Sequence, residues 1–103
     1  MSQDSNPGTD NALILTLRST LRIGEVTEFK QETDALLAAK PELPVVCDAG
    51  AVEFIDAAAL QLLVAMSQAC TAQRREFAID TPSAAFLSAA TVAGYAALLG
   101  LAH

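Results

Sequence analysis

The stretch VVCDAGAVEFIDAAAL, residues 45–60, decides the fold of this chain. It opens with a short β-branched run that is typical of an interior strand, turns at Gly50 and passes through a second short apolar segment. A helix rich in Ala and Leu follows directly after Asp56. An Asp at this position accepts hydrogen bonds from the first N–H groups of a helix and complements the positive end of its dipole. The loop before this helix is therefore the strongest candidate for a functional surface.

The composition predicts one small domain. The chain has 103 residues, of which 52% are apolar and five are aromatic, enough for one modest core built from Ala, Leu and Val. Residues 1–11 are polar, acidic and without periodicity, so we expect a flexible N-terminal tail, not a secretory signal, before a single domain of residues 12–103. The run that starts at Ala57 falls short of the roughly 20 predominantly apolar residues that span a bilayer. We expect a cytoplasmic protein without direct membrane insertion.

The charge of the chain narrows the class of partner. The formal net charge is −6 and the isoelectric point is about 4.4, and the six basic residues are scattered apart from the pair Arg74-Arg75. No basic stripe is present to displace counterions from nucleic acid, which argues against nucleic acid or an anionic membrane surface as a partner. A protein partner fits better. The sequence carries no signal for the oligomeric state.

The first half of the chain predicts two strands and a helix. Residues 12–17 are apolar and residues 21–23 alternate, which predicts a hairpin or a strand pair with a kink near Ser19. Gly24 is expected to end the second strand. A helix from Glu25 to about Ala39 is then predicted by apolar positions at helical spacing, which are Val26, Phe29, Thr33, Leu36 and Leu37.

The second half predicts a long helix, a strand and a shorter helix. The long helix runs from Ala57 to about Arg74, and its outer side is expected to carry Gln61, Gln68 and Arg75. Residues 76–80 alternate like a short strand. Thr81 as a cap and Pro82 at the first helical position predict a helix to about Thr91. Gly94 is expected to break it before a final helical turn or two. The alternation of strands and helices predicts an α/β fold with a mixed sheet.

Signatures of catalysis are weak. The single histidine is the C-terminal residue His103, no Ser or Cys has a base at a recognisable spacing, and no glycine-rich phosphate loop occurs. A local acidic cluster, Asp48, Glu53 and Asp56, lacks the alternating pattern of an EF-hand. We therefore expect neither an enzyme nor a cofactor nor a metal site.

The two cysteines, Cys47 and Cys70, fall within a predicted strand and a predicted helix. They lack the C-x-x-C spacing of metal or redox motifs and have no histidine nearby. We expect two buried, reduced thiols.

The order of these motifs resembles the STAS domain (sulfate transporter and anti-sigma-factor antagonist), in its single-domain bacterial type. Residues 54–63, FIDAAALQLL, are similar to the family's Asp-Ser-Ser-Gly-Leu or Asp-Thr-Ala-Gly-Leu sequence after a Val-x-Phe-Ile-type strand. Residues 46–52, 79–84 and 93–96 resemble the family's Leu-Asp-Leu-Ser-x-Val strand, its Val-x-Pro-Ser-x-x-Val helix start and its Thr-Gly-Leu-Asp end. The resemblance covers about residues 12–101. It implies an α/β fold with a small mixed β-sheet of about four to five strands packed with three to four helices, and with one sheet face less covered.

The resemblance also implies a function, which is binding a partner protein without catalysis. In the antagonists, a kinase-type anti-sigma factor phosphorylates the Ser or Thr just after the Asp, and the phosphate adds up to two negative charges beside the partner contact. Ala57 stands at this position here, Ala58 follows, and Ala59 replaces the usual Gly. The chain is therefore expected not to be switched by phosphorylation at residue 57. The nearest hydroxyls, Thr81 and Ser83, are expected to cap a helix.

The expected partner-binding surface surrounds the start of the long helix and consists of Glu53, Asp56, Ala57, Ala58 and Gln61. Three small residues leave this helix start open to close approach by a partner, although packing and helix propensity alone also explain them. Asp56 either caps the helix only or caps it and contacts the partner as well.

Three functions remain open. The first is a signalling adaptor that resembles an anti-sigma-factor antagonist and binds a sensor kinase or an anti-sigma-type kinase in a partner-switching or chemotaxis-like pathway. The second is the small STAS subunit that docks on the ATPase of an ABC-type phospholipid transporter, which typically carries Thr where this chain has Ala57. The third is a nucleotide-binding or small-ligand-binding domain, against which the missing phosphate cradle and the acidic isoelectric point argue.

Overall fold

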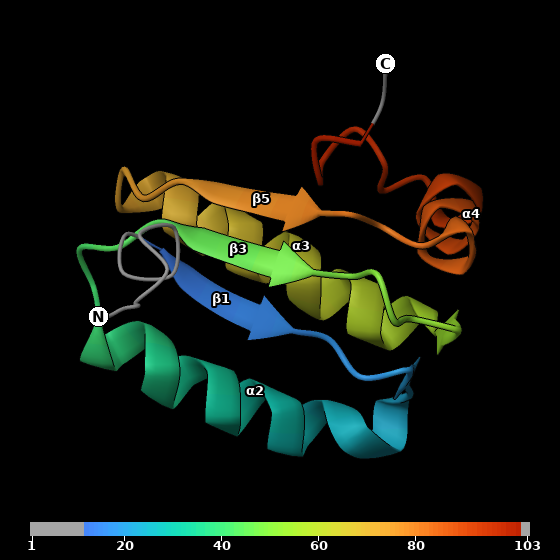
Figure 1. Cartoon of the computed structure of the whole chain (residues 1–103), viewed down its shortest axis with the longest axis horizontal. Coiled ribbons are helices and arrows are strands. Elements are labelled where there is room, and N and C mark those ends of the chain that lie inside the picture. The colour runs from blue at the N-terminus through green and yellow to red at the C-terminus, as the bar shows by residue number, and fades with distance from the viewer. Residues whose placement is uncertain (1–11, 102–103) are drawn as a thin grey trace, which may run out of the picture.

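The computed structural model describes residues 12–101, which form an α/β fold (Figure 1). The predicted fold class is therefore confirmed, whereas the predicted N-terminal tail, residues 1–11, and His103 lie outside the described residues. In chain order the elements are β1 (Leu13–Thr16), β2 (Thr20–Leu21), α2 (Ile23–Ala39), β3 (Val45–Asp48), β4 (Phe54–Ile55), α3 (Ala57–Ala72), β5 (Phe77–Asp80) and α4 (Ala84–Ala93).

The strands form two small parallel sheets. One has the order β1-β3-β5, with Leu13 opposite Val45 and Val45 opposite Phe77, and the other pairs β2 with β4. The predicted mixed sheet is thus corrected, because every pairing among the described strands is parallel. For residues 12–23, the predicted pairing of the two strands was wrong, whereas the predicted kink near Ser19 is present. A bend at Ser19 carries the chain from one sheet to the other, so that β1 and β2 pair with later strands instead of with each other.

Helix α2 leads from β2 of the smaller sheet to β3 of the larger one, α3 leads from β4 to β5, and the two helices pack against each other (Figure 1). Their apolar sides cover one sheet face, where Leu15 and Cys47 are 5% and 0% exposed. Ile14 points to the opposite face and is 41% exposed. Gly24, expected to end a strand, lies in the first turn of α2.

The start of α4 confirms Ser83 as a cap and corrects the prediction that Thr81 caps this helix. Ser83 caps the helix, since its Oγ accepts a hydrogen bond from the N–H of Phe86 at 3.1 Å. Thr81 has a φ of 45° and therefore cannot precede the first helical turn as a cap. Gly94 ends α4 with a φ of 82°, as expected, and one further turn follows in which the N–H of Leu99 donates to the carbonyl of Tyr95 at 3.0 Å.

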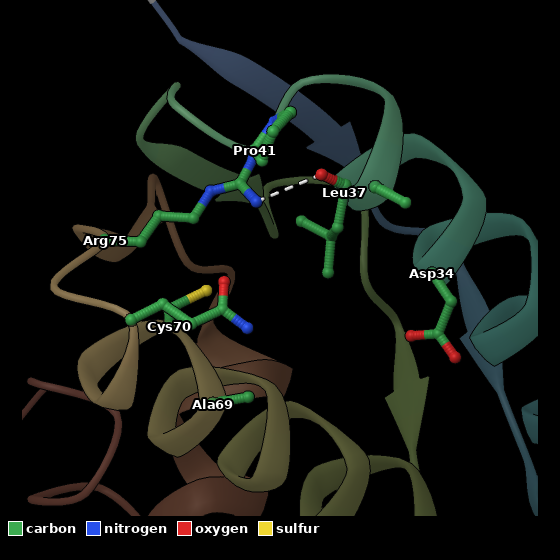
Figure 2. Close-up of a pocket in the computed structure, with 8 residues that line it drawn as sticks. Asp34, Leu37, Pro41, Ala69, Cys70 and Arg75 are labelled. Atoms are coloured by element: carbon green, nitrogen blue, oxygen red, sulfur yellow. Dashed lines mark hydrogen bonds between the residues drawn. The ribbon is translucent and has the colours of Figure 1, made fainter.

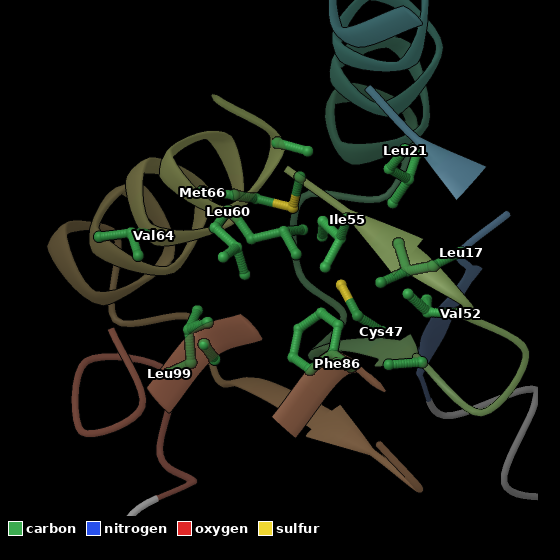
Figure 3. Packing of buried hydrophobic residues seen from close by; sticks show 14 of the residues in the cluster. Leu17, Leu21, Cys47, Val52, Ile55, Leu60, Val64, Met66, Phe86 and Leu99 are labelled. Carbon is green, nitrogen blue, oxygen red and sulfur yellow. The ribbon is translucent and has the colours of Figure 1, made fainter. Parts of the chain in front are cut away.

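The core lies between the sheets and helices α3 and α4 (Figure 3). Phe86 is fully buried and lies against Cys47 in the centre of the cluster. Burial raises the pKa of the Cys47 thiol to about 12, and the nearby Cys70 adds to the shift. Burial also raises the pKa of Cys70, against the opposing effect of the Arg75 charge. The expectation of two buried free thiols is confirmed.

Arg75, expected on the outer side of the long helix, is only 8% exposed. Helix α3 ends at Ala72, and Arg74, with a φ of 59°, turns the chain so that Arg75 faces the end of α2. Arg75 donates three hydrogen bonds to backbone carbonyls. Its Nε donates to Leu43 at 2.5 Å, its Nη1 to Leu37 at 3.1 Å and its Nη2 to Lys40 at 2.5 Å. Arg75 and Cys70 line a pocket of about 410 Å³ between the two helices (Figure 2).

Candidate functional site

The start of α3 is held by both the backbone and the side chain of Asp56. This residue has extended backbone angles, and its Oδ1 accepts a hydrogen bond from the N–H of Ala59 at 3.0 Å. Its own N–H donates to the carbonyl of Leu21 in β2 at 3.0 Å. The predicted cap is confirmed, and the helix start is fixed against the smaller sheet.

The alanines after the cap have different environments. Ala57 is exposed at the first helical position, Ala58 is half-buried and Ala59 is 4% exposed. Gln61, one helical turn after Ala57, is exposed on the same face. Packing therefore explains Ala59, whereas the side chain of Ala57 lies at the surface.

Glu53 is exposed in the segment before β4, where its N–H donates to the carbonyl of Ser19 at 2.7 Å. The structure thus brings the predicted residues Glu53, Asp56, Ala57, Ala58 and Gln61 to one helix start and the segment leading into it. We call these five residues the docking surface. Their role in binding stays a prediction.

Sequence reasoning missed Phe54 and Arg22. Phe54 is 46% exposed, and the guanidinium carbon of Arg22 lies 4.9 Å from the centroid of its ring, a cation–π contact. Ile55, the other residue of β4, is 5% exposed. Because side chains alternate along a strand, burial of Ile55 places Phe54 outward. That alternation is the available signal, but the sequence predicts residues 54–55 only as a short apolar segment, with no assignment of the side that each residue faces.

The segment between β3 and β4 is tied to the segment between β5 and α4. The carboxylate Oδ1 of Asp48 accepts hydrogen bonds from the N–H of Gly50 at 3.0 Å and from the hydroxyl of Thr81 at 3.1 Å. The hydroxyl of Ser83 donates to the carbonyl of Val52 at 2.6 Å. A Cβ at Gly50 would lie 3.3 Å from the carbonyl oxygen of Thr81, so the two segments approach each other closely there. These contacts fix the path that leads into β4 and α3.

The acidic cluster is not gathered into a metal site. Asp48 holds the loop and Asp56 caps α3, while Glu53 is exposed. Within residues 12–101, no group of three or more His, Cys, Asp or Glu side chains is arranged to hold a metal ion. Over the same range, no helix is long and apolar enough to cross a membrane.

Comparison with known proteins agrees with this geometry. A family model described as "Mlab, STAS domain" matches residues 6–100. Neither the curated proteins nor the solved structures gave a match. The matched range contains every described strand and helix, and also the capped helix start with its docking surface. The chain belongs to the STAS domain family.

Proposed function

We propose that this protein is a non-catalytic regulatory module that binds a partner protein through the docking surface at the start of α3. The observation that carries the proposal is the exposed Ala57, at the first position of a helix whose start is capped and tied to β2 by Asp56. A small side chain on a fixed helix start lets a partner approach the backbone closely. Membership of a family of binding modules supports the same conclusion.

The proposed module is not switched by phosphorylation at the start of α3. Neither Ala57 nor Ala58 has a hydroxyl group to accept a phosphate. The hydroxyls of Thr81 and Ser83 bond to Asp48 and to the carbonyl of Val52, so both belong to the network that fixes the loop. Docking is therefore constitutive, or it is regulated by another means.

The proposed partner is a sensor kinase or an anti-sigma-type kinase of a cytoplasmic signalling pathway. The ATPase of an ABC-type phospholipid transporter is the alternative partner class, because the small STAS subunits of such transporters dock through the same helix. A kinase and an ATPase would each bind the docking surface at the start of α3. The same variants therefore test the docking surface for both partner classes. The identity of the protein that binds distinguishes the two classes.

The experiment is a calorimetric titration of the protein with purified kinases and ABC ATPases encoded near its gene. Ala57→Glu should weaken binding about tenfold or more, because the added side chain occupies the space of the contact. The fold should persist, since an acidic residue suits a helix N-terminus. Ala57→Gln adds a side chain of similar size without the charge, so it tests whether size alone weakens binding. We expect that it does.

The control is Ala35→Glu, which places the same side chain on an exposed position of α2, about 18 Å along that helix from its start. It should bind like the unmodified protein. Full affinity of Ala57→Glu would remove the docking surface from the interface. Binding to an ATPase alone, lost in Ala57→Glu, would replace the kinase by the transporter as the partner.

A further inference from the structure

Phe54 and Arg22 form an exposed contact between an aromatic ring and a cation, next in sequence to Glu53 of the docking surface. An aromatic side chain that remains 46% exposed at the surface favours contact with another molecule. Phe54 lies between Glu53 and Asp56 in sequence, on the strand that leads directly into α3. A partner that covers both β4 and the start of α3 would therefore contact this ring. A role of this ring in binding rests on the proposed function.

The pair is held in place before any partner binds. The N–H of Phe54 donates to the carbonyl of Ser19 at 3.0 Å, which holds β4 against the bend before β2. Arg22 immediately precedes α2, and its N–H donates to the carboxylate of Glu25 at 3.1 Å. The guanidinium then lies over the Phe54 ring. A side chain that is already ordered loses less entropy on binding, and aromatic and Arg side chains dominate the energy of protein interfaces.

The charge around this pair indicates the chemistry of the partner. Residues 49–73, which lead into β4 and include all of α3, contain the acidic residues Glu53 and Asp56 and no Lys or Arg. Glu53 is exposed next to Phe54, and Glu25 lies beside Arg22. Electrostatic complementarity therefore favours a partner surface that carries cationic side chains around an apolar centre.

We propose that Phe54, with Arg22 stacked on its ring, is the anchor of the docking surface and inserts into an apolar pocket of a partner protein whose rim carries Lys or Arg. The ring supplies the buried apolar contact at the centre. The acidic residues around it supply attraction at the rim and speed association. The smooth start of α3 at Ala57 allows the two surfaces to close over the ring.

Phe54→Ala tests the anchor in the titration with the purified kinases and ABC ATPases. The affinity should fall about tenfold or more, because a buried aromatic anchor is lost. Arg22→Ala should cause a smaller loss, about threefold, since it removes the stacking partner and leaves the ring. The matched control is Leu36→Ala on α2, whose side chain is 47% exposed and which should bind normally. Thermal unfolding of each variant confirms that the fold persists.

The dependence of the binding affinity on salt concentration tests whether the partner's rim is cationic. The affinity of the unmodified protein should fall several-fold between about 50 mM and about 300 mM NaCl, because salt screens the attraction between exposed charges. An affinity that is unchanged or that rises over this range would overturn the cationic rim.

The variants separate this inference from the proposed function on which it rests. Normal binding of Phe54→Ala together with loss of binding in Ala57→Glu would overturn the anchor and keep the docking surface. Normal binding of both variants would overturn both. The absence of binding to every purified kinase and ATPase would contradict the proposed function and, with it, the anchor.

Discussion

The backbone conformation of Arg74 turns the chain after the end of α3. It adopts a φ of 59°, and the N–H of Arg75 donates back to the carbonyl of Cys70 at 2.7 Å. Glycine usually occupies this left-handed position at the end of a helix, because a Cβ is unfavourable there. The strain in Arg74 is therefore the local cost of turning Arg75 toward α2.

Arg74→Gly should raise the free energy of unfolding by about 0.5–1 kcal/mol, since relief of the left-handed strain exceeds the added flexibility of the unfolded chain. Urea unfolding measures the difference. Arg74→Ala keeps the Cβ and should give no gain. A Gly variant no more stable than the Ala variant would show that the position is not strained.

The capping role of Asp56 was predictable from the sequence, whereas the contacts of Thr81 and Arg75 were not. The cap at Asp56 follows from its own side chain and the next three residues, so the sequence sufficed. Thr followed by Pro is typical of a helix start and so predicts a cap at Thr81, whereas the real partner of Thr81, Asp48, lies 33 positions away in the sequence. The helical period predicts an outer position for Arg75 only if the helix continues to that residue, but α3 ends at Ala72.

At the scale of elements, Arg75 supports the end of α2. The last carbonyls of a helix lack intrahelical partners, and cations near a helix C-terminus are favourable. Here one guanidinium binds Leu37 and Lys40 at that end and Leu43 in the following turn. The contact joins the end of α2 to the segment between α3 and β5.

Arg75→Ala should lower the free energy of unfolding by about 2–4 kcal/mol, because it leaves three carbonyls without their charged donor. Arg75→Lys should recover only part of this loss, since an ammonium group cannot reproduce the planar fork. The comparison variant is Arg18→Ala, which removes the ion pairs with Glu28 and Glu32.

Arg18 lies at the surface, with a side chain that is 41% exposed, so its removal should cost no more than about 1 kcal/mol. Urea unfolding of the three variants gives the order of stabilities. If Arg75→Ala cost no more than Arg18→Ala, the support of α2 by Arg75 would be refuted.

The elements themselves were largely predictable, because their periodicity is a local property of the sequence. Helix α2 was expected from Glu25 and begins at Ile23, and α3 was expected from Ala57 and begins there. The pairing of the strands was harder to predict from the sequence. The pairing of Thr20 with Phe54 and of Leu13 with Val45 joins distant positions, and no local turn signal encodes such parallel pairings.

At the scale of the whole molecule, parallel pairing gathers the docking surface from distant segments. Helices α2, α3 and α4 each follow the carboxyl end of a strand. In parallel sheets that end is the usual location of binding sites. The pairing of β2 with β4 brings Arg22 beside Phe54, next to the start of α3. The sequence could identify Asp56 and Ala57 one by one, but it could not predict the neighbouring pair without this topology.

The most direct test of the docking surface is a backbone-amide NMR titration of the isotope-labelled protein with its purified partner. We predict that shifts or broadening concentrate in residues 53–61 and at Arg22, while residues 34–40 at the far end of α2 remain unchanged. Changes confined to the pocket between α2 and α3 around Arg75, with residues 53–61 unaffected, would contradict a partner-binding surface at the start of α3.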